Sequence, residues 1–371
     1  MKIFHFLKID FDKNRVYGLD ILRAIAILLV VEEHGNYLLP AKVSKYFITF
    51  DGVSIFFVLS GFLIGGILIK ILEREKITLK TLLNFWTRRW FRTLPNYFLI
   101  LTLLASLSLF FVKNFDLWSI RKYFLFLQNF NSPHPAFFPE AWSLSVEEWF
   151  YLLTPVVLFL NAYIFKILPK RNIIITAITI LFFAVGFRFY RYSNFPISTI
   201  NEWDNMFRKQ VITRLDSLIW GLLGAYCYYY YKSSWIKNRK FFFVTGVFIL
   251  IAQKAIELLH LNGLGVYYCV FSFSISSIGT LFLLPALSEL KTGKGLLYKY
   301  ITCISLISYS MYLINLSVIQ IWVLKYINFN LSEIPMVLIK YVLYWIFTIV
   351  GSIIIFKYFE RNLTKLRDKL T

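Results

Sequence analysis

The chain has 371 residues, of which 58% are hydrophobic, 20% aromatic and only 16% charged. Soluble domains average about 45–50% apolar and about 25% charged residues, so this composition excludes an ordinary soluble enzyme and indicates a membrane protein. The 40 Lys and Arg residues against 20 Asp and Glu give a net charge of +20, but nucleic-acid-binding domains are not this hydrophobic, and we expect no nucleic-acid partner.

Ten apolar runs follow one another along the chain, and a helix of about 20 apolar residues spans a bilayer. They cover residues 19–39, 52–72, 94–113, 145–165, 173–190, 211–231, 241–259, 266–288, 304–324 and 335–357. The prediction is an all-α, multi-pass bundle of about ten transmembrane helices in the cytoplasmic (inner) membrane. We expect a single domain over residues 1–371, with short cytoplasmic tails at 1–18 and 358–371 and no fused hydrolase-like domain.

The basic residues predict the orientation. If the N-terminus is inside, the inner segments hold 26 Lys and Arg residues, the outer segments hold 11, and three lie within helices. Cytoplasmic loops carry the excess of Lys and Arg in membrane proteins, so both termini are predicted to be cytoplasmic. The largest outer cluster, residues 188–214, runs against this trend and is a candidate lining for a vestibule that faces a substrate.

The first run contains five ionisable residues, Asp20, Arg23, Glu32, Glu33 and His34. Charges within a membrane are costly, so such residues usually face a polar interior and have a function. Eleven helical steps from Arg23 to His34 return to within about 20° of the same face, about 16 Å further along the helix. Asp20 lies one turn before Arg23 on that face and is expected to neutralise it.

Catalysis is the favoured role for His34, because a neutral imidazole is the usual general base for activating a hydroxyl. Its neighbour Glu33 points to another face of the helix but is a candidate for raising the basicity of His34 through space; Glu32 is a weaker candidate. The alternative is that His34 is an interfacial histidine at the end of a helix.

Three arginines precede the third run in the stretch FWTRRWFRTLPNYF. Arg88 and Arg92 are four residues apart and Arg89 and Arg92 three, so the three guanidinium groups are predicted to converge on one helical surface. Guanidinium forks suit phosphate groups, and neighbouring tryptophans offer faces on which a base could stack. The alternative is a basic flank that binds membrane lipid headgroups.

The stretch PEAWSLSVEEWFYLLTP enters the fourth run from the outside. Ser145 and Glu148 match the spacing of a helix capping box, which would explain Glu148 structurally. Glu147 has no such explanation: it shares a helical face with Ser143 and Tyr151 and is predicted to lie at the depth of His34, where it could orient the imidazole.

Two further stretches have mainly structural interpretations. Ser60-Gly61 and Gly65-Gly66 in the second run are expected to let helices approach closely, and no neighbouring base suggests a nucleophilic serine. Arg214 and Asp216 form either an ion pair or part of a site. The scattered Cys and His residues predict no metal site and no disulfide.

In this order, the stretches resemble the membrane acyltransferase-3 family of integral-membrane glycan O-acyltransferases. The stretches are LDILRAIAILLVVEEH, GVSIFFVLSGFLIGG, FWTRRWFRTLPNYF, FLQNF, AWSLSVEEWFYLLTP, RLDSLIWGLLGAY and ISYSMYLINLSV. The resemblance implies transfer of an acyl group, usually acetyl, from cytoplasmic acyl-CoA to a hydroxyl of an extracytoplasmic carbohydrate or glycolipid. Acyl-CoA would be a substrate, and no permanently bound cofactor is expected.

Carried over by position, the resemblance implies that His34 is the essential histidine, with Arg23 as its partner. Arg89 and Arg92 match the pair associated with the CoA donor, and Glu147 matches the acidic residue of the WSLSVEE motif. One departure is Asn315, which stands where the family commonly has a histidine.

The candidate site therefore has two parts. The catalytic residues are His34, Glu147, Arg23 and Glu33. The substrate-binding residues are Arg88, Arg89, Arg92, Trp142, Ser143, Glu148 and Asp20. An alternative function is a transporter with a His/Arg/Asp pathway through the membrane, and a second is a non-catalytic membrane scaffold.

Overall fold

The computed structural model describes residues 15–44, 50–74, 78–259, 264–329 and 331–370. Helices joined by loops make up this part of the chain, and it contains no strand. The all-α prediction is therefore confirmed for these ranges. Residues 1–14 of the predicted N-terminal tail lie outside them.

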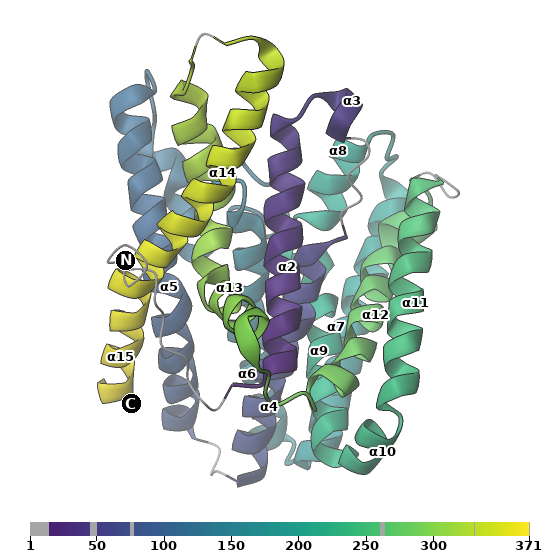
Figure 1. Ribbon diagram of the computed structural model, residues 1–371. Helices are drawn as coiled ribbons and strands as arrows, with labels where there is room; N and C mark the ends of the chain where they lie inside the picture. Colours follow the sequence, from purple (N-terminus) through teal and green to yellow (C-terminus); the bar gives the residue numbers. More distant parts are fainter. Residues whose placement is uncertain (1–14, 45–49, 75–77, 260–263, 330, 371) are drawn as a thin grey trace.

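The helices occur in the chain order drawn in Figure 1. The long ones are α2 (Tyr17–Gly35), α4 (Gly52–Arg74), α5 (Leu79–Phe111), α6 (Ala141–Ile164), α7 (Pro169–Asn194), α9 (Val211–Tyr230), α11 (Arg239–Leu258), α12 (Ser272–Leu287), α13 (Gly295–Ile314) and α14 (Glu333–Ile355). Short α-helices are α3 (Ala41–Ser44), α8 (Ile200–Trp203), α10 (Lys232–Lys237) and α15 (Arg361–Leu370). The 3-10 helices are η1 (Asn36–Leu38), η2 (Leu117–Leu125) and η6 (Leu324–Tyr326), and the π-helical turns are η3 (Asp204–Arg208), η4 (Tyr267–Phe271), η5 (Asn315–Val323) and η7 (Phe356–Glu360).

Every predicted apolar run overlaps one of these long helices. In the described ranges, eight helical segments are long and apolar enough to cross a membrane: Gly52–Arg74, Leu79–Phe111, Ala141–Ile164, Pro169–Asn194, Arg239–Leu258, Tyr267–Leu287, Gly295–Tyr326 and Glu333–Leu366. The other two runs correspond to α2, which carries charged residues near both ends, and α9, which carries Arg214 and Asp216 near its start. Ten crossings and cytoplasmic termini stay predictions.

The largest boundary error concerns the third run. It was expected to begin at residue 94, but α5 begins at Leu79 and continues through Pro95 for 33 residues. Thr78 caps its first turn, because its side chain accepts a hydrogen bond from the Thr81 backbone N–H. The three arginines therefore lie on a helix, as predicted, and this helix is continuous with the third apolar run.

Glycines bring α4 and α9 together at the core of the bundle. A Cβ atom on Gly61 would lie 1.9 Å from the Leu218 carbonyl oxygen, and one on Gly221 would lie 2.1 Å from the Val58 carbonyl oxygen. Only glycine allows backbones to approach this closely. The predicted packing role of the SGFLIGG stretch is thus confirmed at Gly61.

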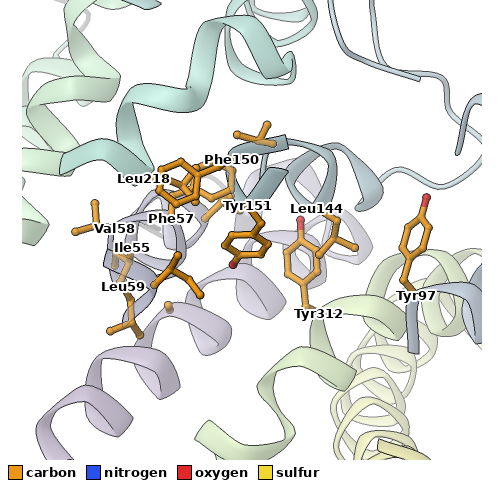
Figure 2. Packing of buried hydrophobic residues seen from close by; sticks show 14 of the residues in the cluster. Ile55, Phe57, Val58, Leu59, Tyr97, Leu144, Phe150, Tyr151, Leu218 and Tyr312 are labelled. Atoms are coloured by element: carbon orange, nitrogen blue, oxygen red, sulfur yellow. The ribbon is translucent and has the colours of Figure 1, made fainter. Parts of the chain in front are cut away.

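Helix α2 runs through the middle of the bundle, where it packs against α13 and α4 (Figure 1). Around it, buried side chains of α4, α6, α9 and α13 form one large apolar cluster. Figure 2 shows part of this cluster, with the Tyr151 ring between Phe57 on one side and Leu144 and Tyr312 on the other. Polar groups at the edge of this part of the cluster line the cavity described next.

Candidate functional site

A central cavity lies between α2, α4, α5, α6, α13 and the end of η7, with an empty volume of about 730 Å³. Its polar and charged lining residues are Arg23, Ser60, Arg89, Arg92, Thr93, Ser143, Glu147, Ser305, Ser308, Tyr309, Tyr312 and Glu360. Three arginines and two carboxylates thus face one space inside an apolar bundle. The more apolar part of the wall comes from Val53, Phe56, Phe57, Leu144 and Leu306.

Two of these arginines make no direct polar contact with a side chain or carbonyl in the described ranges. Neither Arg23 nor Arg92 forms a hydrogen bond or salt bridge there, although both line the cavity. Arg89 donates from Nη2 to the Tyr151 hydroxyl at 3.0 Å, and its guanidinium lies 4.6 Å from the centre of the Tyr151 ring. Since guanidinium groups carry several N–H donors, the cavity presents unused donors and positive charge to a ligand.

Arg88 does not share this space. It is exposed and does not line the cavity, although it lies only one turn of α5 before Arg92. The prediction that all three arginines converge is therefore wrong for Arg88. Arg23 of α2 takes the third place instead.

Glu147 lies at the centre of a hydrogen-bonded chain in the cavity wall. Ser60 Oγ donates to Glu147 Oε1 at 2.9 Å, and the Tyr151 hydroxyl donates to Oε2 at 3.2 Å. Tyr151 in turn accepts from Arg89. The shared face of Glu147 and Tyr151 is confirmed, but this carboxylate contacts the arginine side of the site rather than His34.

Glu148 points away from the central cavity. Thr93 Oγ1 donates to its Oε1 at 2.8 Å, and its side chain lines a mostly apolar groove with Trp90, Phe98 and Trp149. The predicted capping box is wrong: α6 begins at Ala141, so Ser145 lies inside the helix and donates to the Ala141 carbonyl.

His34 has a partner that the sequence did not predict. Its Nδ1 lies 2.6 Å from Oδ1 of Asn315, the first residue of η5. The Asn315 amide nitrogen donates to the carbonyl oxygens of Met311 and Tyr312, at 2.9 and 2.8 Å. Carbonyl oxygens only accept, so the amide oxygen must face His34, and Nδ1 must carry the proton. The lone pair of the neutral ring is then on Nε2.

Asp20 does not pair with Arg23 as predicted. Arg15 Nε donates to its Oδ2 at 2.9 Å, Arg15 Nη2 also contacts Oδ1, and Ser305 Oγ donates to Oδ1 at 2.7 Å. The carboxylate is thereby satisfied at the start of α2. Its direct partners are therefore Arg15 and Ser305, and in the described ranges it forms no salt bridge with Arg23.

Of the two predicted binding residues at the start of α6, only Ser143 lines the cavity. Ser143 Oγ is 2.6 Å from the Tyr312 hydroxyl, which donates to the Glu140 carbonyl oxygen at 2.9 Å. Trp142 does not line the cavity; its ring lies 5.4 Å from the Arg208 guanidinium and 5.8 Å from that of Arg214. Tyr312 therefore stands between the cavity and the region of Asn315 and His34.

Glu33 joins a different group of charges. Its Oε1 lies 3.5 Å from Arg208 Nη2, and Arg208 also donates to Asp204 at 3.1 Å. Glu32 accepts a hydrogen bond from Tyr341 at 2.8 Å. Neither glutamate hydrogen-bonds to His34, so Asn315 replaces Glu33 and Glu147 as the side chain that orients the imidazole.

Two carboxylates, the half-buried Glu360 and the buried Glu140, were not among the candidate residues. Glu360 of η7 lines the central cavity and accepts hydrogen bonds from Asn96 at 2.8 Å and Ser310 at 2.9 Å. Glu140, directly before α6, accepts from the Ser317 backbone N–H at 2.7 Å and also from the Ser317 hydroxyl. The hydrogen-bond donors to both side chains lie more than 45 positions away in the chain. No local sequence pattern could therefore indicate these contacts.

Glu140 predicts a pH dependence of stability. Burial raises its pKa from 4.5 to about 7, although the hydrogen bonds from Ser317 partly offset this effect. The folded protein then binds more protons than the unfolded chain, so the free energy of unfolding falls as the pH rises. The contribution of Glu140 to stability is therefore full below pH 4.5 and is lost as the pH rises through about 7. The loss is on the order of 3 kcal/mol.

Replacing Glu140 with glutamine is expected to flatten the dependence of stability on pH over this interval. Thermal unfolding in detergent, followed at pH 5 and pH 8, measures the effect, with the exposed Glu333→Gln as the control. Equal slopes for the wild type and Glu140→Gln would contradict the assignment.

The chain was compared with known proteins. A family model described as an acyltransferase domain matches residues 16–357. One similar protein, from Staphylococcus aureus (strain COL), is provisionally named an O-acetyltransferase. It is 30% identical over 231 residues, which cover 56% of this chain and 34% of that protein. The peptidoglycan O-acetyltransferase OatA of Listeria monocytogenes is 32% identical over 164 residues, covering 40% of this chain and 25% of that protein.

A Bacillus subtilis protein, provisionally named as a peptidoglycan O-acetyltransferase, is 35% identical over 167 residues, covering 40% of this chain and 24% of that protein. The matches thus span about a third or less of the length of these relatives. No solved structure matches the chain significantly.

Proposed function

The chain belongs to the acyltransferase family whose model covers residues 16–357, and on this premise we propose which donor, acceptor and residues its acyl-transfer reaction uses. The enzyme moves an acetyl group from acetyl-CoA, bound from the cytoplasmic side, to a hydroxyl of a carbohydrate on the opposite side. The proposal rests on two features. The first is the central cavity with its unpaired arginines, and the second is the oriented His34, which lies further along α2 than Arg23.

The donor site rests on charge. CoA carries phosphate groups, and Arg23, Arg89 and Arg92 offer guanidinium donors in a polar cavity that lies inside an apolar bundle. Arg92 is exposed, so it stands where the cavity opens. Bidentate guanidinium contacts suit phosphate oxygens, and they strengthen where water is excluded. The excess of basic residues at the predicted inner ends of the helices supports entry of the donor from the cytoplasm.

The base is His34. Its unprotonated Nε2 takes the proton from the acceptor hydroxyl while the oxygen attacks the thioester carbonyl. The C–S bond then breaks, CoA leaves as the thiolate, and the proton passes from the imidazolium to that sulfur. The products are an acyl ester and CoA, and no step requires a metal or a redox cofactor.

Tyr312 connects the two parts of the site. It lines the central cavity, and its carbonyl accepts a hydrogen bond from Asn315, the partner of His34. Eleven residues of helix, about 16 Å, separate Arg23 from His34. With the phosphates held at the arginines, the flexible arm of CoA would carry the thioester past Tyr312 toward the imidazole.

The acceptor is proposed from the relatives. OatA is named a peptidoglycan O-acetyltransferase, and the hydroxyls of such glycans lie outside the cytoplasmic membrane. We place the acceptor on the side where α2 ends. These arguments favour acyl transfer over the alternative of a transporter, which gives no role to a match with an acyltransferase family.

Purified protein in proteoliposomes tests the proposal. Supplied with radiolabelled acetyl-CoA and a soluble glycan fragment, it should release CoA and place the label on the glycan in an alkali-labile ester. A protein that binds acetyl-CoA but esterifies no glycan would overturn the choice of acceptor. Failure to bind acetyl-CoA would overturn the donor site.

Asn315 is proposed as the positioning residue of His34. Replacing it with leucine removes the acceptor for Nδ1–H, so kcat should fall about tenfold while KM for acetyl-CoA is unchanged. Asn315→Asp keeps an acceptor oxygen but loses the donors to Met311 and Tyr312. It should therefore recover most of the activity if orientation of the imidazole is what matters.

Ring ¹⁵N NMR signals of His34 provide a direct measurement for this prediction. The wild type should show a protonated Nδ1, and Asn315→Leu should show a mixture of tautomers. If Asn315→Asp is as inactive as Asn315→Leu, the side chain serves only to hold the Met311 and Tyr312 carbonyls at the end of α13, and the positioning role is wrong.

A further inference from the structure

A second, larger cavity opens at the end of the bundle where α2 ends. We call it the outer vestibule; it has an empty volume of about 1430 Å³. Its walls come from the end of α2, from α8 and η3, from the last turns of α11 and from η4 and the start of α12. Figure 1 shows α8 and the end of α11 near the same end of the bundle as α3.

Aromatic side chains form one part of the vestibule wall. Tyr37, Trp203, Tyr267 and Tyr268 all line it, and Tyr37 is 69% exposed. Tyr37 also stacks with His34, with ring centres 6.3 Å apart. Flat rings with a polar edge pack against the C–H faces of sugars while their hydroxyls stay free to hydrogen-bond. The stacking places this wall next to the proposed base.

The charges of the vestibule are paired within it. Arg208 lies 3.5 Å from Glu33 and 3.1 Å from Asp204, and Lys254 lies 3.0 Å from Glu257. These are the two cations that line the vestibule among the described residues, and each already has a carboxylate partner. No free cation is left for an anionic ligand.

Carboxylates outnumber cations in this wall. Glu33, Asp51, Asp204 and Glu257 line the vestibule, against Arg208 and Lys254. Burial favours the neutral form of Asp51, but the nearby Arg208 and Arg214 outweigh it and lower its pKa, so Asp51 is ionised. Two cations outside the lining also contact these carboxylates: Lys209 pairs with Asp204, and Arg214 lies 3.8 Å from Asp51. A negatively charged ligand would have to compete with a carboxylate for each of these cations, and this competition weakens its binding.

The two cavities therefore differ in kind. The central cavity has arginines without partners and suits an anion, whereas the outer vestibule has its cations neutralised and its surface lined by aromatic rings, amides and carboxylates. Gln253 and Asn201 add amide groups that both donate and accept hydrogen bonds. This combination fits the hydroxyl and amide groups of an uncharged sugar.

We propose that the outer vestibule is the acceptor site and that it selects uncharged sugars, including N-acetylated ones, over sugars that carry carboxylate, phosphate or sulfate groups. The inference rests on the proposed acyl transfer to a carbohydrate. It adds the location of the acceptor, the residues that hold it and the class of glycan that is excluded.

Binding measurements on the purified full chain in detergent test the inference. An uncharged chitooligosaccharide and a sulfated oligosaccharide of equal length are titrated separately by calorimetry, and acetyl-CoA binding is measured in the same samples. The uncharged sugar should bind at least tenfold more tightly than the sulfated one. Equal or tighter binding of the sulfated sugar would overturn the inference.

Two variants locate the site. Tyr37→Ala and Tyr267→Ala each remove one ring from the vestibule and should weaken binding of the chitooligosaccharide about five- to tenfold, with acetyl-CoA binding unchanged. Trp118→Ala removes a ring that is 70% exposed on η2, away from the vestibule, and should have no effect. If both tyrosine variants bind the sugar like wild type, the vestibule is not its site.

A charge variant tests selectivity separately. Glu257→Gln frees Lys254 from its carboxylate partner, so the sulfated oligosaccharide should gain affinity relative to the uncharged one. No change in this ratio would overturn the electrostatic part of the inference. Wild-type protein that binds acetyl-CoA but neither sugar would refute the vestibule as acceptor site while leaving the proposed donor site intact.

Discussion

Replacing His34 with alanine is expected to lower kcat for acyl transfer by a factor of about 10²–10⁴, the usual contribution of a positioned general base. The reason is that the position at which the family commonly has a second histidine holds Asn315, which cannot accept a proton at working pH. Acetyl-CoA binding should be unchanged, because His34 does not line the central cavity.

Esterification of a glycan fragment by His34→Ala, measured at saturating acetyl-CoA, provides the rate. The matched control is Ile25→Ala, which changes an exposed residue on the same helix, 46% exposed. A well-folded His34→Ala protein that acylates at the wild-type rate would remove His34 from the mechanism.

The second large effect is expected at Arg92. Arg92→Ala removes an unpaired guanidinium from the mouth of the central cavity. A hydrogen bond to a charged group is worth about 1.5–3 kcal/mol, so Kd for acetyl-CoA should rise by a factor of about 10–100. Folding should tolerate the change, since Arg92 has no hydrogen bond or salt bridge in the described ranges.

Arg88 supplies the control for this prediction. It lies one turn of α5 earlier and is equally basic, but it is exposed and does not line the cavity. Arg88→Ala should change Kd for acetyl-CoA by less than about twofold. If Arg88→Ala weakens binding as much as Arg92→Ala, the donor is held outside the cavity by general positive charge and the proposed site is wrong.

Some of this organisation could be predicted from the sequence, because it depends on local patterns. Apolar runs of bilayer length located the long helices, and Gly61 indicated the close approach of α4 and α9. Helical periodicity also placed Glu147 and Tyr151 on one face, where they hydrogen-bond.

The errors concern contacts between residues far apart in the chain. Asp20 has its nearest arginine on the helix at Arg23, but it pairs with Arg15 and Ser305. Likewise, Asn315 lies 281 residues from His34, and no spacing rule links a residue of α2 with the first residue of a π-helical turn. Tertiary packing decides such pairs, so periodicity could not identify the partner of His34.

The separation of the site into two cavities was also beyond a sequence argument. In the sequence, Glu33 is the neighbour of His34, and Glu147 is predicted to lie at the same depth in the membrane. In the structure, Glu33 contacts Arg208 in the outer vestibule, whereas Glu147 contacts Ser60 and Tyr151 in the central cavity. Side chains one position apart on a helix point about 100° apart and enter different environments. The chemistry therefore depends on which cavity each helical face meets.

A sided transfer assay tests the central claim most directly. Inside-out membrane vesicles that contain the protein enclose an uncharged glycan fragment, and labelled acetyl-CoA is added to the exposed cytoplasmic face. We expect labelled O-acetyl esters on the enclosed glycan, and we expect them to be absent with His34→Ala or reduced with Arg92→Ala. Label on a glycan only when it shares a compartment with acetyl-CoA, or equal labelling by His34→Ala, would contradict the account.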